Sequence, residues 1–213
     1  MRLYSYWRSS SSFRVRIALE LKGLDYGIVP VHLVRDGGEQ HRDDYRRLNP
    51  QGYVPMLVHG PHRITQSMAI IDYLDRVFPE PALTPDDPGK RAMVLAFAQT
   101  IAADIQPLQN LSVLRYLTET LGHPDPVRVQ WSAHWIYKGL RALESSVAEH
   151  PRHACCFGDT PGLAEVCLVP QMYNAERFGV DLDALPELVR VTNHCRAMPA
   201  FQRAHPDSQP DAE

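Results

Sequence analysis

With 213 residues, the chain is long enough to bury a core and to form one or two domains, and its 44% apolar and 22% charged residues are ordinary for a globular protein. A net charge of −3 argues against a nucleic-acid binder that relies on a broad basic surface. No apolar run approaches the length of a membrane span, and the N-terminus leads into a predicted strand rather than a signal peptide. We therefore expect a cytoplasmic protein with neither nucleic acid nor membrane as a partner.

The first predicted strand, Leu3–Trp7, leads into a run of four serines, Ser9–Ser12. The run opens a helix predicted over Phe13–Lys22, with Gly23 as its stop. A helix start presents unpaired N–H groups and the positive end of the helix dipole, so it favours an anion, and Arg8 lies directly before it. The run fits a plain helix cap with solvated serines equally well, so alone it does not decide between a cap and a site.

Short strands and helices continue to alternate up to Pro79-Glu80-Pro81. The elements are an extended run over 26–33, strands at Val54–His59 and Arg63–Thr65 on either side of a Gly60-Pro61 hairpin turn, and a helix over Ser67–Val77 with Ser67 as its N-cap. A parallel βαβ unit followed by an antiparallel pair and a helix is the thioredoxin-like pattern.

Two dipeptides in this part of the chain are candidates for ligand contact. Pro55 follows Val54 at the start of a strand, where a proline removes a ladder donor unless its bond is cis or the edge is exposed. A cis bond would leave the N–H and C=O of Val54 free to pair with a peptide-like ligand, and the sequence barely separates cis from trans. Gln66 and Ser67 open the next helix, whose N-terminus suits a carboxylate, although an ordinary capping serine is commoner.

After Pro88 the pattern is helical throughout. Helices are predicted at Lys90–Leu121, Pro126–Glu149, Leu163–Phe178 and Leu185–Ala197, with no convincing strand between them. We therefore predict an α/β thioredoxin-like domain over residues 1–80 and an all-α domain over residues 88–213.

The four cysteines, Cys155, Cys156, Cys167 and Cys195, lack C-x-x-C spacing, and the adjacent pair is poor geometry for a local disulfide or a zinc site. The ten histidines form no H-x-x-x-H pair on a clear helix. Reduced, structural thiols and no metal centre are therefore expected.

Motifs in both predicted domains together resemble the zeta class of glutathione transferases. They are, in chain order, Tyr4-Ser5-Tyr6-Trp7-Arg8-Ser9-Ser10, Arg14-Val15-Arg16-Ile17-Ala18-Leu19, Leu48-Asn49-Pro50, Val54-Pro55, Gln66-Ser67, Gln106-Pro107-Leu108-Gln109-Asn110 and Asn174-Ala175-Glu176-Arg177-Phe178. The similarity runs from Leu3 to Pro210, and the motifs are specific as a set because they recur in the right order. The resemblance implies the glutathione transferase fold and a homodimer.

The same resemblance implies a glutathione-dependent cis–trans isomerase that converts maleylacetoacetate to fumarylacetoacetate in tyrosine and phenylalanine breakdown. Ser9 would lie against the glutathione sulfur with Ser10 beside it, as the catalytic pair. The other implied glutathione contacts are Gln40, Val54, Gln66, Ser67 and Gln106. Arg8 and Arg177 would receive the carboxylates of a small dicarboxylate substrate.

The chemistry of a capped helix start agrees with this role for Ser9. A free thiol has a pKa of about 8.5 and is mostly protonated at neutral pH. A hydroxyl hydrogen bond to a charged sulfur contributes roughly 1.5–3 kcal/mol, and a helix N-terminus roughly 0.3–1 kcal/mol. Together they lower the thiol pKa by about 1.5–3 units, enough to make the thiolate the major form. The thiolate would add to the cis double bond, allow rotation and leave again, so glutathione would act as a cofactor.

The chain departs from the zeta pattern at two places, one at the start of each of two predicted helices. Ser11 stands where these isomerases usually carry cysteine, and Gly162 stands where their N-capping box has Ser or Thr, with Glu165 in place of Asp. The glycine should weaken the helix start by only about a few tenths of a kcal/mol. Related glutathione-dependent maleylpyruvate isomerases also lack this cysteine, so Ser11 leaves isomerisation of maleylpyruvate as an alternative activity. A transferase acting on α-haloacids and a non-catalytic glutathione-binding protein are further alternatives.

Overall fold

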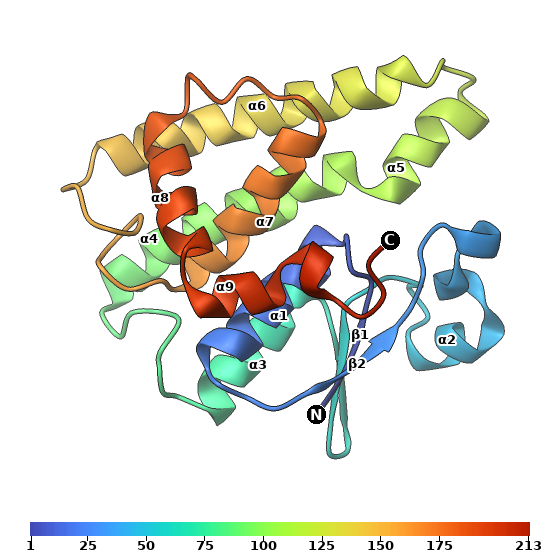
Figure 1. Cartoon of the computed structure of the whole chain (residues 1–213), viewed down its shortest axis with the longest axis horizontal. Coiled ribbons are helices and arrows are strands. Elements are labelled where there is room, and N and C mark those ends of the chain that lie inside the picture. The colour runs from blue at the N-terminus through green and yellow to red at the C-terminus, as the bar shows by residue number, and fades with distance from the viewer. The chain divides into compact units, whose positions relative to one another are not determined.

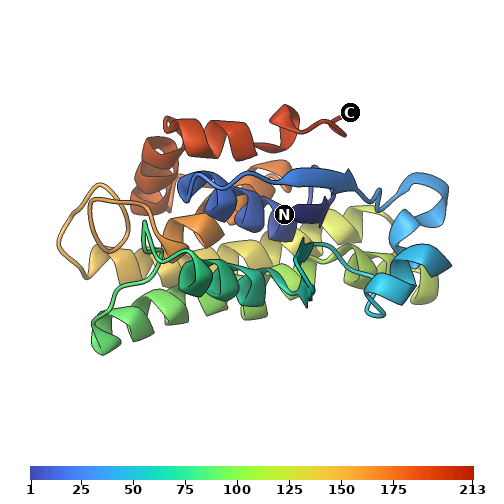
Figure 2. The ribbon, with the colours of Figure 1, turned by 90° about the horizontal axis from the view of Figure 1, so that it is seen from below.

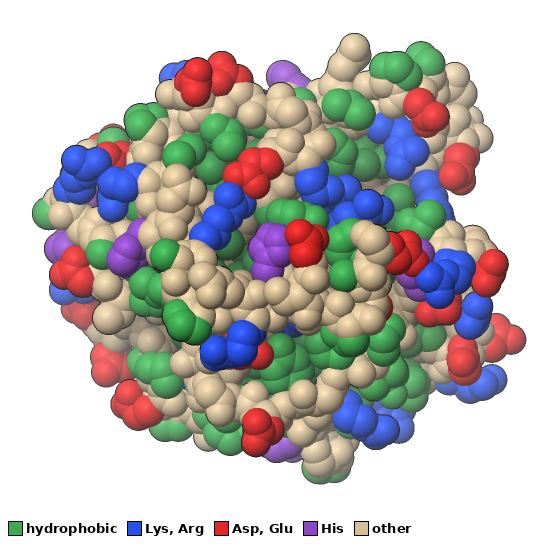
Figure 3. Space-filling model, in the orientation of Figure 1, with side chains coloured by type: hydrophobic (Ala, Val, Ile, Leu, Met, Phe, Trp, Pro, Cys, Tyr) green, Lys and Arg blue, Asp and Glu red, His purple; other side chains and the backbone are tan.

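The structure is a computed structural model that describes residues 1–213. It divides into two compact units, unit 1 with residues 1–83 and 198–213 and unit 2 with residues 84–197. The last residues therefore belong with the N-terminal unit, whereas the predicted domain 88–213 placed them with the helices. Acidic, basic and apolar side chains are interspersed on the face that Figure 3 shows. No helix is both long enough and apolar enough to span a membrane.

Unit 1 is built on a four-stranded mixed sheet in the order β2-β1-β3-β4 (Figure 1). The strands are β1 (Arg2–Ser5), β2 (Gly27–Pro30), β3 (Met56–His59) and β4 (His62–Thr65). β2 runs parallel to β1, whereas β3 is antiparallel to both β1 and β4. The predicted hairpin turn is present, and Gly60 adopts the positive φ of 56° that such a turn requires. The thioredoxin-like fold class is confirmed.

Four helices complete unit 1. They are α1 (Ser10–Leu21), α2 (Asp43–Leu48), α3 (Ser67–Val77) and α9 (Pro199–Ala204). α1 begins three residues before the predicted Phe13 because Ser9 caps it, and it stops before Gly23, whose φ is 62°. α3 has the predicted bounds, but its N-cap is Gln66 and not Ser67. The six-residue helices α2 and α9 were not predicted, because so short a helix carries little periodic signal.

Two arginines of α1 lie inside unit 1. Arg14 is 1% exposed and Arg16 is fully buried. Arg16 donates to the carbonyl of Ala204 at 2.9 Å and to the carbonyl of Trp7 at 2.9 Å, so one guanidinium joins α9 to the loop after β1. Figures 1 and 2 both show the C-terminal segment, drawn in red, beside the blue α1, and α1 also contacts α3.

Unit 2 is all-α, as predicted. Its helices are α4 (Pro88–Gln99), α5 (Leu111–Arg115), α6 (Pro126–Ala148), α7 (Leu163–Arg177) and α8 (Pro186–Arg196). α7 packs against α4, α6 and α8, which explains why nearly every residue from Leu163 to Ala175 is buried.

The single helix predicted over Lys90–Leu121 is wrong. After α4 the chain forms a π-helical segment over Thr100–Ile105 and a 3₁₀ turn over Gln106–Gln109. Pro107 lacks an N–H for the helical ladder, and the extended Asn110 then caps α5 by accepting from the Ser112 N–H at 3.0 Å.

Candidate functional site

The start of α1 is a capped helix terminus. The Ser9 Oγ accepts a hydrogen bond from the Ser12 N–H at 3.2 Å, and Ser9 is half-buried with extended φ and ψ. Since the oxygen is used as an acceptor, the hydroxyl proton remains able to donate to an anion outside the helix. No acidic side chain lies in the first turn, which contains the buried Ser10 and the half-buried Ser11. The cap and the anion site are therefore compatible functions of one serine.

The loop before Ser9 is fixed through both backbone polar groups of Trp7. The Trp7 N–H donates to the Asp211 carboxylate at 3.0 Å, and the Trp7 carbonyl accepts from Arg16. The guanidinium of Arg8 lies over the Trp7 ring, 5.2 Å from its centroid. Arg8 is half-buried and so is held near the helix start without being enclosed.

The peptide bond between Val54 and Pro55 is cis, which answers the question that the sequence left open. Val54 precedes the first residue of β3, so its N–H and C=O lie outside the ladder of paired strands. The residue before it, Tyr53, is anchored through its carbonyl, which accepts from the Tyr45 hydroxyl at 2.6 Å and from the Asn49 amide at 2.8 Å.

The junction between β4 and α3 is the third part of the site. Gln66 has a φ of 69°, a left-handed conformation that non-glycine residues rarely adopt and that recurs at ligand clamps. Its amide donates to the Gln51 side chain at 2.7 Å. Ser67 is 6% exposed, and its Oγ accepts from the Arg14 guanidinium at 3.2 Å.

The strand register brings these three parts to one end of the sheet. Tyr4 near the end of β1 is opposite Met56 at the start of β3, and Met56 is opposite Thr65 at the end of β4. The chain reaches the serine run shortly after β1, passes Val54 shortly before β3, and reaches Gln66-Ser67 directly after β4. The predicted contacts from residues 9–10, 54 and 66–67 therefore share one sheet end.

The remaining predicted contacts lie in other segments of the chain. Gln40 is 4% exposed in a short turn, where its amide donates to the Leu33 carbonyl at 3.3 Å. Gln106 and Arg177 belong to unit 2, where Gln106 is half-buried. Arg177 ends α7, is exposed and donates to the Asn174 side chain at 3.2 Å. Their contributions to a glutathione or substrate site stay predictions.

Sequence reasoning missed three supporting residues, namely Arg14, Arg16 and Asp211. Arg14 and Arg16 stand inside a motif that resembles the zeta class, but nothing identified them as buried, and nothing identified Asp211 as hydrogen-bonded to the loop. The available signal was the placement of two arginines inside an otherwise apolar helix.

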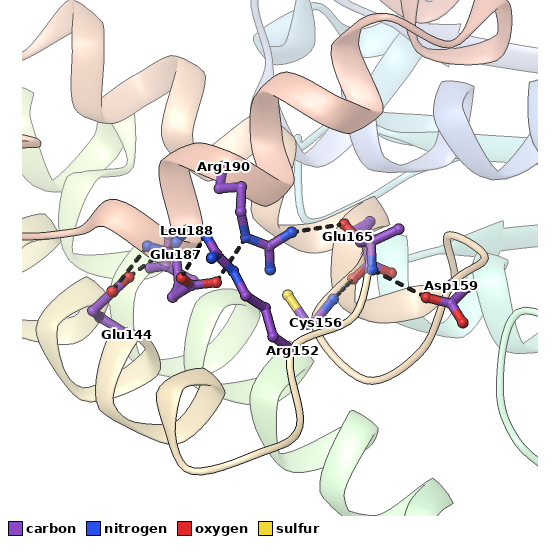
Figure 4. A network of polar contacts seen from close by, with 9 residues as sticks. Glu144, Arg152, Cys156, Asp159, Glu165, Glu187, Leu188 and Arg190 are labelled. Atoms are coloured by element: carbon purple, nitrogen blue, oxygen red, sulfur yellow. Dashed lines mark hydrogen bonds and ion pairs between the residues drawn. The ribbon is translucent and has the colours of Figure 1, made fainter.

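Unit 2 contains a separate polar network around the start of α8 (Figure 4). The Glu187 carboxylate is 2.7 Å from Arg190 and 3.3 Å from Arg152. Glu144 of α6 accepts from the N–H groups of Glu187 and Leu188, which caps α8. A cavity of about 180 Å³ lies beside these groups. Because its charges already pair with one another, we interpret the network as holding residues 149–162 against α8.

The α7 end of the network explains how Gly162 is tolerated. The buried Glu165 carboxylate accepts from the Gly162 N–H at 2.8 Å and from the Cys156 N–H at 2.9 Å. Glu165 thus supplies a capping contact at the N-terminus of α7 while it anchors the preceding loop. Burial, together with this carboxylate, raises the pKa of the Cys156 thiol, which keeps it protonated and unreactive. All four cysteines are free and buried.

Comparison with known proteins identifies the family. Residues 1–76 match the family described as glutathione S-transferase, N-terminal domain. The maleylacetoacetate isomerase of Pseudomonas aeruginosa is 51% identical over 212 residues, which covers 99% of this chain and 98% of that protein. A holo structure of maleylpyruvate isomerase, a bacterial zeta-class glutathione S-transferase, has a TM-score of 0.97 at 42% identity, with both chains fully covered. The chain belongs to the zeta class of glutathione transferases.

A further zeta-like structure shows what a related site accommodates. The maleylacetoacetate isomerase of Anaeromyxobacter dehalogenans is 43% identical with a TM-score of 0.87, and the match covers 100% of this chain and 93% of that one. It was solved with dicarboxyethyl glutathione and citrate bound in its active site. The glutathione transferase fold predicted for the present zeta-class chain is confirmed by these comparisons.

Proposed function

We propose that this zeta-class protein is a glutathione-dependent isomerase that converts maleylacetoacetate to fumarylacetoacetate. The observation that carries the proposal is the 51% identity to the Pseudomonas aeruginosa maleylacetoacetate isomerase over nearly the whole of both chains. The capped serine at the start of α1 supports it, because the hydroxyl proton of Ser9 is available to a thiolate. Homodimer assembly stays a prediction from the resemblance, and cytoplasmic location stays a prediction from the sequence.

The residues at the sheet end fit a glutathione molecule chemically. Val54 has a backbone outside the strand ladder, which suits pairing with the cysteinyl peptide group. Ser67 has a hydroxyl held by Arg14 at the N-terminus of α3, which suits the glutamyl end together with Gln66. We assign Gln40 and Gln106 as further contacts on the resemblance alone.

Glutathione, when bound, supplies a thiolate that adds reversibly to a conjugated cis double bond. Ser9 donates its proton toward the sulfur and, with the N–H groups of the first turn, favours the charged form at neutral pH. Ser10 lies beside it in that turn. Arg8 and Arg177 receive the two substrate carboxylates. During rotation one arginine keeps its carboxylate and holds that end of the substrate, while the other end turns about the bond that has become single.

The relative from Anaeromyxobacter dehalogenans supports thiol addition as the chemistry. Its ligand, dicarboxyethyl glutathione, has the composition of glutathione added across the double bond of a butenedioate. A site that accepts such a compound can accommodate both glutathione and a neighbouring dicarboxylate. The present chain needs local positive charge for the same purpose, because its net charge is −3.

Maleylpyruvate isomerisation is the second candidate. The TM-score of 0.97 to a maleylpyruvate isomerase favours it, as does Ser11 at the usual cysteine position of the class. A shorter substrate with the same maleyl group would use the same thiolate and the same two arginines.

Steady-state assays of both substrates, with and without glutathione, test the proposal. We expect a higher kcat/KM for maleylacetoacetate, no turnover without glutathione and no net consumption of glutathione. A higher kcat/KM for maleylpyruvate would reassign the substrate, and conjugate formation with an α-haloacid alone would indicate a transferase. Failure to bind glutathione at millimolar concentration would exclude both isomerase activities and indicate a non-catalytic protein.

A further inference from the structure

Arg14 connects two helices behind the predicted glutamyl subsite. Its side chain comes from α1, is 1% exposed and donates from Nη1 to the Oγ of Ser67, the first residue of α3. Both side chains of this 3.2 Å hydrogen bond are buried. The contact therefore places a permanent positive charge directly behind the hydroxyl of Ser67.

This contact determines the direction of the Ser67 hydroxyl. A guanidinium has donors only, so the Ser67 oxygen is the acceptor and its own proton cannot point back at Arg14. The hydroxyl must then donate to a group on its other side. A carboxylate is an acceptor only, whereas an ammonium is a donor only, so Ser67 is set to recognise a carboxylate.

The backbone around Ser67 favours the same charge. Gln66 has no side-chain hydrogen bond that caps α3, and its amide is directed to Gln51 instead. The first turn of α3 contains no acidic residue, so the positive end of the helix dipole is not offset locally. Arg14, the Ser67 hydroxyl and the helix terminus therefore all favour a negatively charged group.

We propose that Arg14 is a positioning residue that fixes Ser67 as a hydrogen-bond donor and so selects the α-carboxylate of the γ-glutamyl group. This inference rests on the proposed function, which puts the glutamyl end of glutathione at Ser67. Arg14 does not touch the ligand in this proposal. It acts through the Ser67 hydroxyl and through the field of its buried charge.

The test compares two ligands by calorimetry. One is glutathione, and the other is γ-aminobutyryl-cysteinyl-glycine, which lacks only the glutamyl α-carboxylate. Arg14→Met is expected to weaken glutathione roughly tenfold, as for the loss of one charge-assisted hydrogen bond, and to change the analogue less than about twofold. In a Ser67→Ala background Arg14→Met should weaken glutathione binding only about twofold, because the hydroxyl through which Arg14 acts is absent. Arg14→Lys, which retains a charged donor, should recover part of the loss.

Equal weakening of both ligands by Arg14→Met would overturn the inference and indicate a general structural role. A wild-type protein that does not bind glutathione would instead remove the proposed function, and the inference with it. If neither Arg14 variant folds by circular dichroism, Arg14→Gln takes their place, because its neutral amide can still donate to Ser67. Greater weakening of glutathione than of the analogue supports the inference, and equal weakening overturns it. A Ser67→Ala variant that retains the preference for glutathione over the analogue also overturns it.

Discussion

The backbone N–H of Trp7 donates to the carboxylate of Asp211, a residue 204 positions further along the chain. Arg16 holds the carbonyl of the same tryptophan and also binds Ala204 in α9. The backbone of Trp7, directly before Arg8 and Ser9, is therefore fixed by the C-terminal segment at its N–H and by Arg16 of α1 at its carbonyl. Support for the predicted sulfur subsite comes from residues that are remote in sequence.

Removing the Asp211 carboxylate should loosen this loop. Asp211→Ala is expected to lower the free energy of unfolding by about 1–3 kcal/mol, since it leaves a partly buried N–H without its charged acceptor. It should also raise the KM for glutathione. Asp211→Asn keeps an acceptor oxygen and should show less than half of either effect, as measured by urea unfolding and steady-state kinetics. An unchanged KM in Asp211→Ala would mean that Arg16 alone positions the loop.

Ser9→Ala tests the two functions of the helix cap together. We expect the pKa of bound glutathione, followed by thiolate absorbance, to rise by about 1–2 units and activity near neutral pH to fall roughly tenfold or more. The loss of the cap should also cost about 0.5–2 kcal/mol of stability. Ser9→Asp separates the effects, because aspartate caps a helix well but repels a thiolate. Ser9→Asp should restore the unfolding midpoint but not the activity. An unchanged pH–rate profile in Ser9→Ala would exclude a role for Ser9 in stabilising the thiolate.

Substrate binding by Arg177 is open to a kinetic test. Arg177→Ala should raise the KM for the dicarboxylate substrate at least about tenfold and leave the KM for glutathione within about twofold, as expected for the loss of a charged hydrogen bond to one ligand only. Arg177→Lys keeps the charge without the bidentate fork, so its KM for the dicarboxylate should lie between those of the wild type and Arg177→Ala. A parallel rise in both KM values would instead indicate that its contacts with Asn174 and the neighbouring rings are structural.

Alkaline unfolding should report on Tyr45. Burial raises the pKa of Tyr45 to about 12, whereas an unfolded tyrosine ionises near pH 10. The neutral phenol is thus favoured by folding, so its contribution is complete below pH 10 and is lost as the pH rises from 10 to 12. The loss should be on the order of 2–3 kcal/mol. Tyr45→Phe should flatten this part of a stability-against-pH curve, and an unchanged slope would contradict the assignment.

The cap of α8 gives a stability prediction away from the site. Glu144→Ala removes the acceptor of the Glu187 and Leu188 N–H groups and should destabilise unit 2 by about 1–3 kcal/mol. Glu144→Gln retains one acceptor oxygen and should recover much of that loss. Glutathione affinity, measured by calorimetry below the unfolding temperature, should stay unchanged in both, since no residue of the network is a predicted glutathione contact.

The sequence predicts elements well where the signal is local. Ser67–Val77 forms a helix with the expected bounds, and the turn at Gly60 and the stop at Gly23 follow from positive φ angles that glycine accepts. The helix predicted over Lys90–Leu121 failed because one proline and one capping asparagine outweigh the apolar period.

What could not be predicted depends on contacts between distant residues. The burial of Arg14 and Arg16 requires partners from other elements, and the local pattern, two arginines among apolar residues, does not identify those partners. The same holds for the return of residues 198–213 to unit 1. For the candidate site, the sequence named the residues that lie at one sheet end, but not those that hold them there.

The return of the C-terminal segment also sets an order on folding. Contacts that span 188 and 204 positions complete unit 1, so a nascent chain cannot finish this unit until residues 84–197 have been made. A fragment ending at residue 83 would have the whole sheet and lack both α9 and Asp211. Such a fragment would be a poor substitute for the intact protein in glutathione-binding work, because the backbone N–H of Trp7 would have lost its acceptor, Asp211.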